Sequence, residues 1–195
     1  MAKKIFVTFG LFLSLVFCAI SQSYSLNDKT PSEVWITGKS TLHDWNVSTS
    51  GPQNLPLSVS TNEDGGLTLE GFNFTLNVDE FDGGRGASMN EKIRNAFNSK
   101  AHPQVVFSQS ASTTVTLDAQ NAFTTNVTGT LDMAGQSKTI NVQVTGKIEN
   151  GQLSMNGQQA LKMSEFSMEP PSAMFGQIKT ADEVVVHFKL HYIEN

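Results

Sequence analysis

The sequence predicts an all-β protein, an antiparallel barrel or sandwich of about eight strands with one short inserted α-helix. Apolar and polar residues alternate with a period of two along most of the chain, which is the pattern of half-buried strands. Only 16% of the 195 residues are charged, and this low fraction argues against long charged helices. Turn-forming sequences separate the alternating runs, as expected for consecutive antiparallel strands.

The N-terminus, residues 1–21, is predicted to be a cleaved signal peptide. Two lysines precede the apolar stretch Ile5–Ile20, which is too short for a stable membrane span. The small residues Ala19 and Ser21 lie where a signal peptidase recognises its cleavage site. We therefore expect an exported protein in which residues 22–195 form a single domain.

The single cysteine, Cys18, lies in this segment and leaves one alternative open. In a lipoprotein, Cys18 would become the acylated first residue. Such signals place a small side chain just before the cysteine, where this chain has Phe17. Cleavage after Ser21 is therefore favoured, and the exported chain then has neither a disulfide nor a thiolate metal site.

The N-terminal half of the exported chain contains short strands interrupted by loops. Residues 21–32 are polar and are expected to be a loose lead-in, and the first alternating run is Val34–Lys39. Within Leu67–Val78 the apolar residues move from odd to even positions across Gly71. This change of phase predicts a β-bulge or a bend in one long strand.

One segment, Ser88–Asn98, departs from the β pattern and predicts a short amphipathic helix. Met89, Ile93 and Phe97 recur every four residues, which places them on one face of a helix. Ser88 is followed three residues later by a glutamate, which is the signature of a capping box.

The C-terminal half contains the most regular alternation. Long alternating runs cover Val127–Met133, Ile140–Ile148 and Val184–Tyr192. Asn150-Gly151 follows the second run and is typical of a two-residue hairpin turn, because both turn positions require positive φ. In a barrel surrounded by water, the apolar face of these strands points inward.

Several small and flexible residues fall on this inward face and allow two interpretations. The glycines omit an inward side chain and could leave room for a ligand, while methionine adapts to irregular apolar surfaces. Alternatively, the glycines let strands bend and the methionines fill gaps in a packed core. The residues concerned are Gly38, Gly129, Gly146, Gly157, Met133, Met155 and Met163.

Four short segments, in the order in which they occur, carry a family resemblance. They are GKSTLHDW at Gly38–Trp45, PQVVFS at Pro103–Ser108, GTLDMAG at Gly129–Gly135 and DEV at Asp182–Val184. Together they resemble the YceI-like family, the polyisoprenoid-binding proteins of the bacterial periplasm, over essentially the whole chain after the signal peptide. The resemblance implies a periplasmic, lipocalin-like protein. Its extended antiparallel barrel would enclose an apolar channel for an amphiphile, with a helix at one side.

The resemblance favours a true cavity and so makes the inward-facing residues candidates for ligand binding. Replacing Gly146 or Gly157 with leucine is then expected to block lipid uptake and leave the fold intact. The candidate ligand-binding residues are Gly38, His43, Trp45, Phe72, Phe74, Phe107, Gly129, Leu131, Met133, Val144, Gly146, Met155, Gly157, Met163, Met168, Met174, Phe175 and Phe188.

Two of these candidates, His43 and Trp45, could hold a polar head group. The imidazole and the indole N–H can form hydrogen bonds while the ring packs on an apolar chain. The alternative is that Ser40, His43 and Asp44 hold a turn through side-chain to backbone hydrogen bonds, and that Trp45 fills the core.

The segment Met168–Ile178 is too apolar for an ordinary loop, and two consecutive prolines stiffen it. It is interpreted either as a lid or rim at the mouth of the channel or as a segment that packs under the helix at Ile93 and Phe97. The overlapping segment Phe166–Gly176 resembles the version found in a subset of the YceI-like family.

Several functional classes are disfavoured by the sequence. The net charge of −5, without a basic stripe, gives no footprint for nucleic acid. His187 and His191 share a strand face, but a spacing of four residues is roughly 13 Å, too far apart for one metal ion. No Gly-x-Ser-x-Gly elbow, cysteine nucleophile or obvious carboxylate pair points to an enzyme. We therefore expect no metal, no cofactor and no catalytic residues.

The favoured function is a carrier that sequesters an isoprenoid or similar long-chain lipid. The competing hypothesis is a structural or interaction module of the cell envelope, with a filled barrel that binds its partner through the outer face. A homodimer and an envelope partner both remain open, and nothing in the sequence identifies the head group of the ligand.

Overall fold

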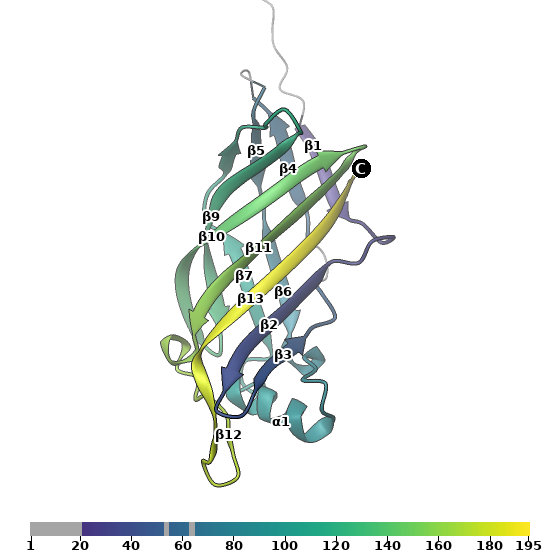
Figure 1. The fold of residues 1–195 in the computed structure, drawn as a ribbon. Helices are drawn as coiled ribbons and strands as arrows, with labels where there is room; N and C mark the ends of the chain where they lie inside the picture. The colour runs from purple at the N-terminus through teal and green to yellow at the C-terminus, as the bar shows by residue number, and fades with distance from the viewer. Residues whose placement is uncertain (1–20, 53–54, 63–64) are drawn as a thin grey trace, which may run out of the picture.

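The described residues form a strongly curled antiparallel sheet with one α-helix at its end (Figure 1). The computed structural model describes residues 21–52, 55–62 and 65–195, so residues 1–20 of the predicted signal peptide, with Cys18, lie outside the described residues. Over the described residues the sheet has 13 strands. This confirms the lipocalin-like all-β fold class, while the number of strands exceeds the expected eight or so.

The strands pair mainly with their sequence neighbours, in the order β6-β7-β9-β10-β11-β13-β1-β4-β5-β8, and β2 and β3 extend from one edge of β13. All pairs between these strands are antiparallel. The elements are β1 Ser21–Leu26, β2 Glu33–Ser40, β3 Asp44–Ser48, β4 Leu57–Thr61, β5 Leu67–Glu70, β6 Asn73–Asn77, the 3₁₀ turn η1 Val78–Glu80, α1 Ala87–Ala96, β7 Gln104–Gln109, β8 Thr113–Val115, β9 Ala122–Met133, β10 Gln136–Glu149, β11 Gln152–Lys162, the 3₁₀ turn η2 Met163–Phe166, β12 Ser172–Ala173 and β13 Ile178–Glu194.

The last strand, β13, is 17 residues long and pairs with different strands along its length. Near its C-terminal end it pairs with β1, and nearer its start it pairs with β2, while β11 lies along its other edge. The body is therefore elongated. One end holds the β1, β4 and β5 strands, and the other holds α1 and the β12 hairpin (Figure 1).

Tight turns explain why β9, β10 and β11 form the most regular part of the sheet. Ala134 and Gly135 connect β9 to β10, and Asn150 and Gly151 connect β10 to β11, all with positive φ. Asparagine and glycine adopt this conformation at low steric cost, and the turn matches the right-handed twist of the strands. The hairpin predicted at Asn150-Gly151 is thus confirmed.

Two local predictions in the N-terminal half are wrong. The mostly polar residues Ser21–Leu26 are not a loose lead-in but form β1, which pairs with both β4 and β13 and buries Tyr24 in the core. Leu67–Val78 is not one bent strand. It divides at Gly71, whose φ is +78°, into β5 and β6, and these strands have different partners.

The predicted helix is confirmed as α1, but its capping box is not. Gly86 is the N-cap residue, and no side-chain hydrogen bond caps the helix. Ile93 and Phe97 are buried, and the Phe97 ring meets Phe81 edge to face with centroids 5.3 Å apart. This apolar face fixes α1 against the end of the sheet.

The glycines on the inward face do not leave empty space beside them, which corrects the expectation for Gly129, Gly146 and Gly157. A Cβ atom at Gly146 would overlap the ring of Phe123, and one at Gly129 would overlap the ring of Phe107. At Gly157 the Cβ would lie 2.5 Å from both the Phe188 ring and the backbone oxygen of Gln143. Each glycine therefore accommodates an aromatic ring from the neighbouring strand, a packing that stabilises antiparallel pairs.

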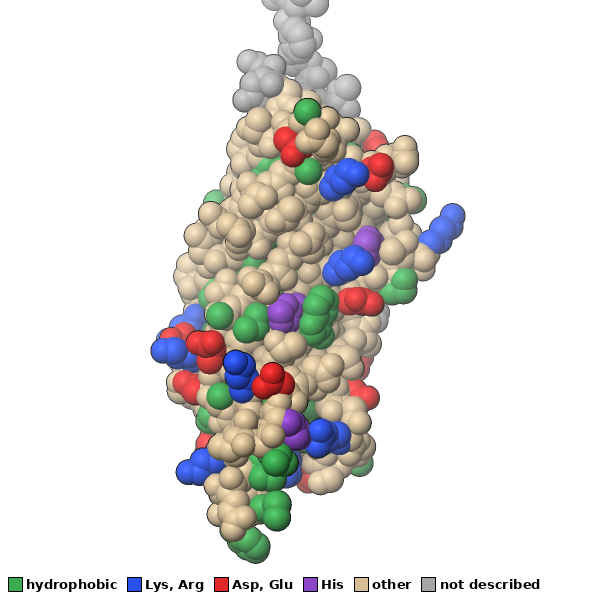
Figure 2. Space-filling view, in the orientation of Figure 1, with side chains coloured by type: hydrophobic (Ala, Val, Ile, Leu, Met, Phe, Trp, Pro, Cys, Tyr) green, Lys and Arg blue, Asp and Glu red, His purple; other side chains and the backbone are tan. Residues whose placement is uncertain are grey.

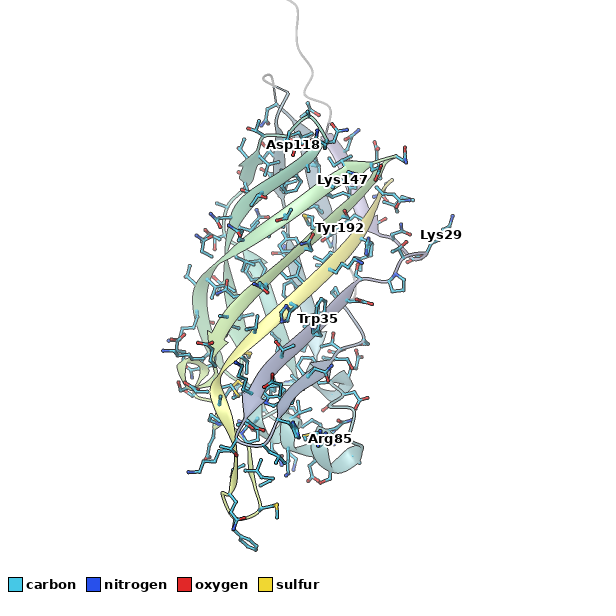
Figure 3. The ribbon with its side chains drawn as sticks, viewed as in Figure 1. Lys29, Trp35, Arg85, Asp118, Lys147 and Tyr192 are labelled. Atoms are coloured by element: carbon cyan, nitrogen blue, oxygen red, sulfur yellow. The ribbon has the colours of Figure 1, made fainter. Side chains whose placement is uncertain are left out.

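The half of the interior distant from α1 is filled with side chains. Val144 and Met155, two of the predicted ligand-binding residues, are buried there and are at most 2% exposed. Tyr192 lies among them on β13 (Figure 3) and is 1% exposed. Its hydroxyl has no hydrogen-bond partner among the described residues, and burial raises the pKa of Tyr192.

Replacing Tyr192 with phenylalanine is expected to raise the free energy of unfolding by about 1 kcal/mol. A buried hydroxyl without a partner costs about 1–3 kcal/mol of desolvation, and Tyr192→Phe removes that group while it keeps the ring. Urea unfolding of the two proteins at neutral pH measures the difference. A loss of stability of more than about 1 kcal/mol would show that the hydroxyl does have a partner in the folded protein.

Candidate functional site

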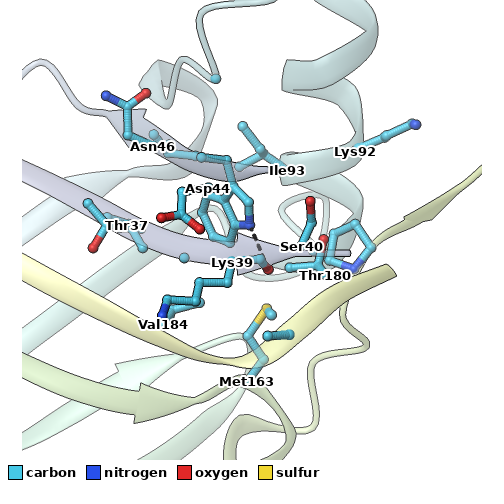
Figure 4. Close-up of a pocket in the computed structure, with 18 of the residues that line it drawn as sticks. Thr37, Lys39, Ser40, Asp44, Asn46, Lys92, Ile93, Met163, Thr180 and Val184 are labelled. Carbon is cyan, nitrogen blue, oxygen red and sulfur yellow. Dashed lines mark hydrogen bonds between the residues drawn. The ribbon is translucent and has the colours of Figure 1, made fainter. Parts of the chain in front are cut away.

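A cavity of about 960 Å³ opens at the α1 end of the sheet. Its walls come from β2, β3, α1, η2 and the β12–β13 hairpin, and Figure 4 shows Ile93 and Met163 on opposite sides of this space. The volume lies at the upper end of the range for cavities that hold small ligands.

The buried and the exposed parts of the cavity wall differ in chemistry. The buried part is apolar and includes Ile93, Phe97, Met133, Leu161, Met163, Met168 and Val184. The exposed part carries charge: Lys39, Asp44, Arg85, Lys92 and Glu183. An amphiphile fits such a wall with its apolar chain inside and its polar end towards water.

A second, smaller cavity of about 60 Å³ lies deeper between the sheet faces. It is lined mainly by aromatic and aliphatic side chains, among them Phe72, Phe74, Phe107 and Phe188. The same residues border both cavities at their junction: Ile36, Phe97, Met133, Leu161 and Val186. The two cavities are therefore adjacent and share part of one apolar wall.

The turn between β2 and β3 satisfies most of its polar groups internally. Ser40 Oγ donates to the His43 carbonyl oxygen at 2.8 Å and accepts from the backbone N–H of His43 at 3.2 Å. His43 Nδ1 lies 2.8 Å from the Asp44 carbonyl oxygen and donates to it, because a carbonyl oxygen can only accept. These bonds match the turn-forming alternative, while His43 still borders the large cavity.

Trp45 has a structural role and also borders the cavity. Its Nε1 donates to the Lys39 carbonyl oxygen at 3.1 Å, the bond drawn in Figure 4, so this N–H is not available to a head group. Its ring lies over Gly38, where a Cβ atom would overlap it. The ring is partly exposed and lines the cavity, so a ligand chain can pack on it.

The other tryptophan, Trp35, lies on the outer face of the sheet (Figure 3). Its ring stacks on that of His187, with centroids 5.0 Å apart and planes 6° apart. His187 Nε2 is hydrogen-bonded to Thr37 Oγ1 at 2.9 Å. The two tryptophans therefore lie on opposite faces of the β2–β3 hairpin, Trp45 on the cavity side and Trp35 on the outer side.

The 3₁₀ turn η2 places two methionines in the cavity wall. Asp182 accepts hydrogen bonds from the backbone N–H and the hydroxyl of Ser164, at 2.8 and 2.6 Å. These bonds lower the pKa of Asp182 and keep its carboxylate charged against η2. Met163 is the first residue of this turn and Met168 follows it, and the backbone N–H of Met168 donates to the Met163 carbonyl oxygen at 3.1 Å.

The segment between η2 and β13 both packs under α1 and forms part of the rim of the cavity, the two roles that the sequence predicted as alternatives. Met168 is buried and lines the cavity together with Ile93 and Phe97, as the packing alternative requires. Residues 171–173 border its opening, as a rim would. Met174 and Phe175 do neither, because they point into solvent at the tip of the hairpin.

Most of the candidate residues meet at the two cavities, while the remainder lie elsewhere. Those on the cavity walls are Gly38, His43, Trp45, Phe72, Phe74, Phe107, Leu131, Met133, Met163, Met168 and Phe188. Those away from both are Gly129, Val144, Gly146, Met155, Gly157, Met174 and Phe175.

Sequence reasoning missed the part of the wall that α1 and β2 supply. Met89, Ile93, Ala96 and Phe97 of the α1 segment and Ile36 of β2 border the large cavity. The four-residue spacing on α1 could have indicated them, because the apolar face of the one helix in an all-β chain must cover apolar surface of the sheet.

Neither a metal cluster nor a membrane-spanning helix is present in the part of the chain that the structure describes. No group of three or more His, Cys, Asp or Glu residues in that part could hold a metal ion. No helix formed by these residues is long and apolar enough to cross a membrane.

The comparison with protein families is decisive for the assignment. The model of the YceI-like domain matches residues 27–192, which cover nearly all the described residues. The chain belongs to the YceI-like family. A comparison with curated proteins gives no match.

Three solved structures share the fold. BcnA of Burkholderia cenocepacia is 23% identical, with a TM-score of 0.59 over 82% of this chain and 95% of BcnA. A polyisoprenoid binding domain from Saccharophagus degradans is 18% identical, with a TM-score of 0.60 over 88% of this chain and 98% of that domain. The YceI protein of Campylobacter jejuni is 12% identical, with a TM-score of 0.52 over 76% and 84% of the two chains.

Proposed function

We propose that this YceI-like protein is a periplasmic carrier that holds a long-chain isoprenoid or similar amphiphilic lipid in the cavity beneath α1. The observation that supports this most is the large cavity, whose buried wall is apolar and whose exposed wall carries charges. The polyisoprenoid binding domain with the same fold is consistent with a ligand of this class. The periplasmic location rests on the signal peptide expected from the sequence.

The energetics of burial favour a long chain over a short one. Ten methylenes contribute roughly 8 kcal/mol at about 0.8 kcal/mol each. Association costs of about 4–15 kcal/mol can cancel that contribution. Affinity should therefore rise with chain length until the large cavity is full.

The head group is expected to remain at the opening. Trp45 Nε1 and His43 Nδ1 already donate to backbone carbonyl oxygens, and His43 Nε2 has no hydrogen-bond partner among the described residues. The charged side chains on the exposed wall are of both signs. The exposed wall is therefore expected to discriminate little between head groups of different charge, and the apolar chain supplies most of the binding free energy.

The competing function, a filled module that binds only through its outer face, is favoured by the packed half of the interior. It does not account for the cavity at the α1 end, which is larger than packing defects in protein cores.

Organic extraction of the purified protein, followed by mass spectrometry, tests the proposal. We expect extraction to release a long-chain lipid, and the stripped protein to bind long-chain alcohols more tightly as their chains lengthen. If no lipid is released and the stripped protein binds none of the alcohols, the carrier function is wrong and the filled module is supported.

A further inference from the structure

Exposed apolar side chains gather at the end of the molecule where the cavity opens. Four large apolar side chains among the described residues are exposed, and three of them, Leu42, Met174 and Phe175, belong to the two loops at this end. They are 64%, 63% and 108% exposed. We call these three residues the apolar tip, and Figure 2 shows the apolar side chains that extend from the narrow end of the body.

The two loops of the apolar tip are joined into one unit. The backbone N–H of Thr41 donates to the Lys179 carbonyl oxygen at 3.0 Å, and that of Lys179 donates to Thr41 Oγ1 at 3.1 Å. Thr41 Oγ1 in turn donates to the Gln177 carbonyl oxygen at 3.3 Å. Leu42 is therefore held next to the β12–β13 hairpin, and the apolar tip is presented as a single surface.

The turn of the β12–β13 hairpin contains residue types that its backbone conformation disfavours. Met174 and Phe175 have φ of 49° and 53°, in the left-handed region that bulky side chains disfavour. Asn150 and Gly151 also have positive φ, in the shorter, two-residue turn between β10 and β11, and they are residue types that adopt this conformation at low cost. Two strained, solvent-exposed apolar residues at a turn do not stabilise the fold, so they indicate a contact with something outside it.

The charges around the apolar tip complement an anionic surface. Residues 38–43 and 170–181 contain Lys39 and Lys179, both exposed, and no carboxylate, although the whole chain has a net charge of −5. The nearest carboxylates in the sequence are Asp44, Glu169, Asp182 and Glu183, of which Asp182 is turned towards Ser164. An apolar protrusion flanked by lysines is the arrangement by which proteins bind to the surface of an anionic bilayer.

We propose that the apolar tip docks this protein on an anionic lipid bilayer, with Met174, Phe175 and Leu42 inserted among the acyl chains and Lys39 and Lys179 at the head groups. Pro171, Ser172, Ala173 and Leu42 also border the large cavity, so docking places its opening at the bilayer surface. The docking goes beyond lipid binding in the cavity and does not require it.

The decisive variant combines Met174→Asn with Phe175→Gly. Asparagine and glycine adopt positive φ more easily than methionine and phenylalanine. The melting temperature of the variant should therefore stay the same or rise. Co-sedimentation with vesicles of phosphatidylglycerol and phosphatidylethanolamine should fall at least about tenfold, because two large apolar side chains no longer insert. Unchanged sedimentation, or no binding of the unmodified protein to these vesicles, overturns the proposal.

Charge reversals test the second half of the proposal. Each of Lys39→Glu and Lys179→Glu should lower binding to the same vesicles about fivefold, while Lys29→Glu, at an exposed position outside the two loops, serves as the matched control (Figure 3). Vesicles of phosphatidylcholine alone should bind more weakly and show no difference between these variants. Equal effects at positions 29, 39 and 179 would show that only the net charge matters, and would overturn docking through the tip.

Discussion

Leucine at position 157 is expected to lower the free energy of unfolding by about 3 kcal/mol, the upper part of the range for overpacked cores. The Cβ of the new side chain would lie 2.5 Å from the Gln143 carbonyl oxygen and from the Phe188 ring. The ring can turn away, but the backbone of β10 cannot move without disrupting its pairing with β11. Urea unfolding measures the loss.

Replacing Gly146 or Gly157 with alanine distinguishes the stability lost through overlap with a ring from that lost through overlap with the backbone. Gly146→Ala meets only the Phe123 ring among its nearest neighbours, so Phe123→Leu should restore much of the stability in the double variant. Gly157→Ala also meets the Gln143 carbonyl oxygen, so Phe188→Leu should restore little.

If Gly157→Leu instead folds normally and loses lipid uptake, the space beside Gly157 is open to the ligand, and the packing described above is wrong.

Tryptophan at position 186 is expected to weaken lipid binding without loss of stability. Val186 is partly buried on β13 and borders both cavities, so a larger side chain there fills space that the ligand needs. If the ring displaces about four methylenes at about 0.8 kcal/mol each, affinity falls on the order of a hundredfold. Titration of the stripped variant with a long-chain alcohol measures this, and thermal unfolding checks the fold.

Two further variants control for the position of the new ring. Ala96→Phe fills the same cavity from α1 and should also weaken binding. Lys189→Trp adds the same ring at an exposed position on β13 outside both cavities and should have no effect. Lipid binding that is unchanged in both Val186→Trp and Ala96→Phe would place the ligand somewhere other than the cavity.

The strand pattern and the helix could be predicted because they depend on local sequence. Alternation in β9, β10 and β13 and the four-residue spacing in α1 follow directly from which face must be buried. β1 could not be predicted in this way. Tyr24 and Leu26 are its only apolar residues, too few for a clear alternation, and its pairing partners β4 and β13 are distant in the sequence.

The glycines show why the site was only partly predictable. Alternation correctly places Gly129, Gly146 and Gly157 on the inward face, but it does not indicate what lies opposite them. Pairing register determines that Gly146 faces Phe123 and that Gly157 faces Phe188, and register depends on the folded sheet. The empty space lies instead at the α1 end, where Gly38 is covered by Trp45 and the wall is completed by helix residues.

The position of the ligand is the central claim, and the two tryptophans of the chain make it measurable. Trp45 lines the cavity, whereas Trp35 stacks on His187 on the outer face. A brominated long-chain alcohol quenches only a tryptophan that it contacts, so each tryptophan is studied alone, in the stripped Trp35→Phe and Trp45→Phe proteins. We predict saturable quenching of Trp45 in Trp35→Phe and unchanged Trp35 emission in Trp45→Phe. No quenching of Trp45, or equal quenching of both, would contradict lipid binding in the cavity beneath α1.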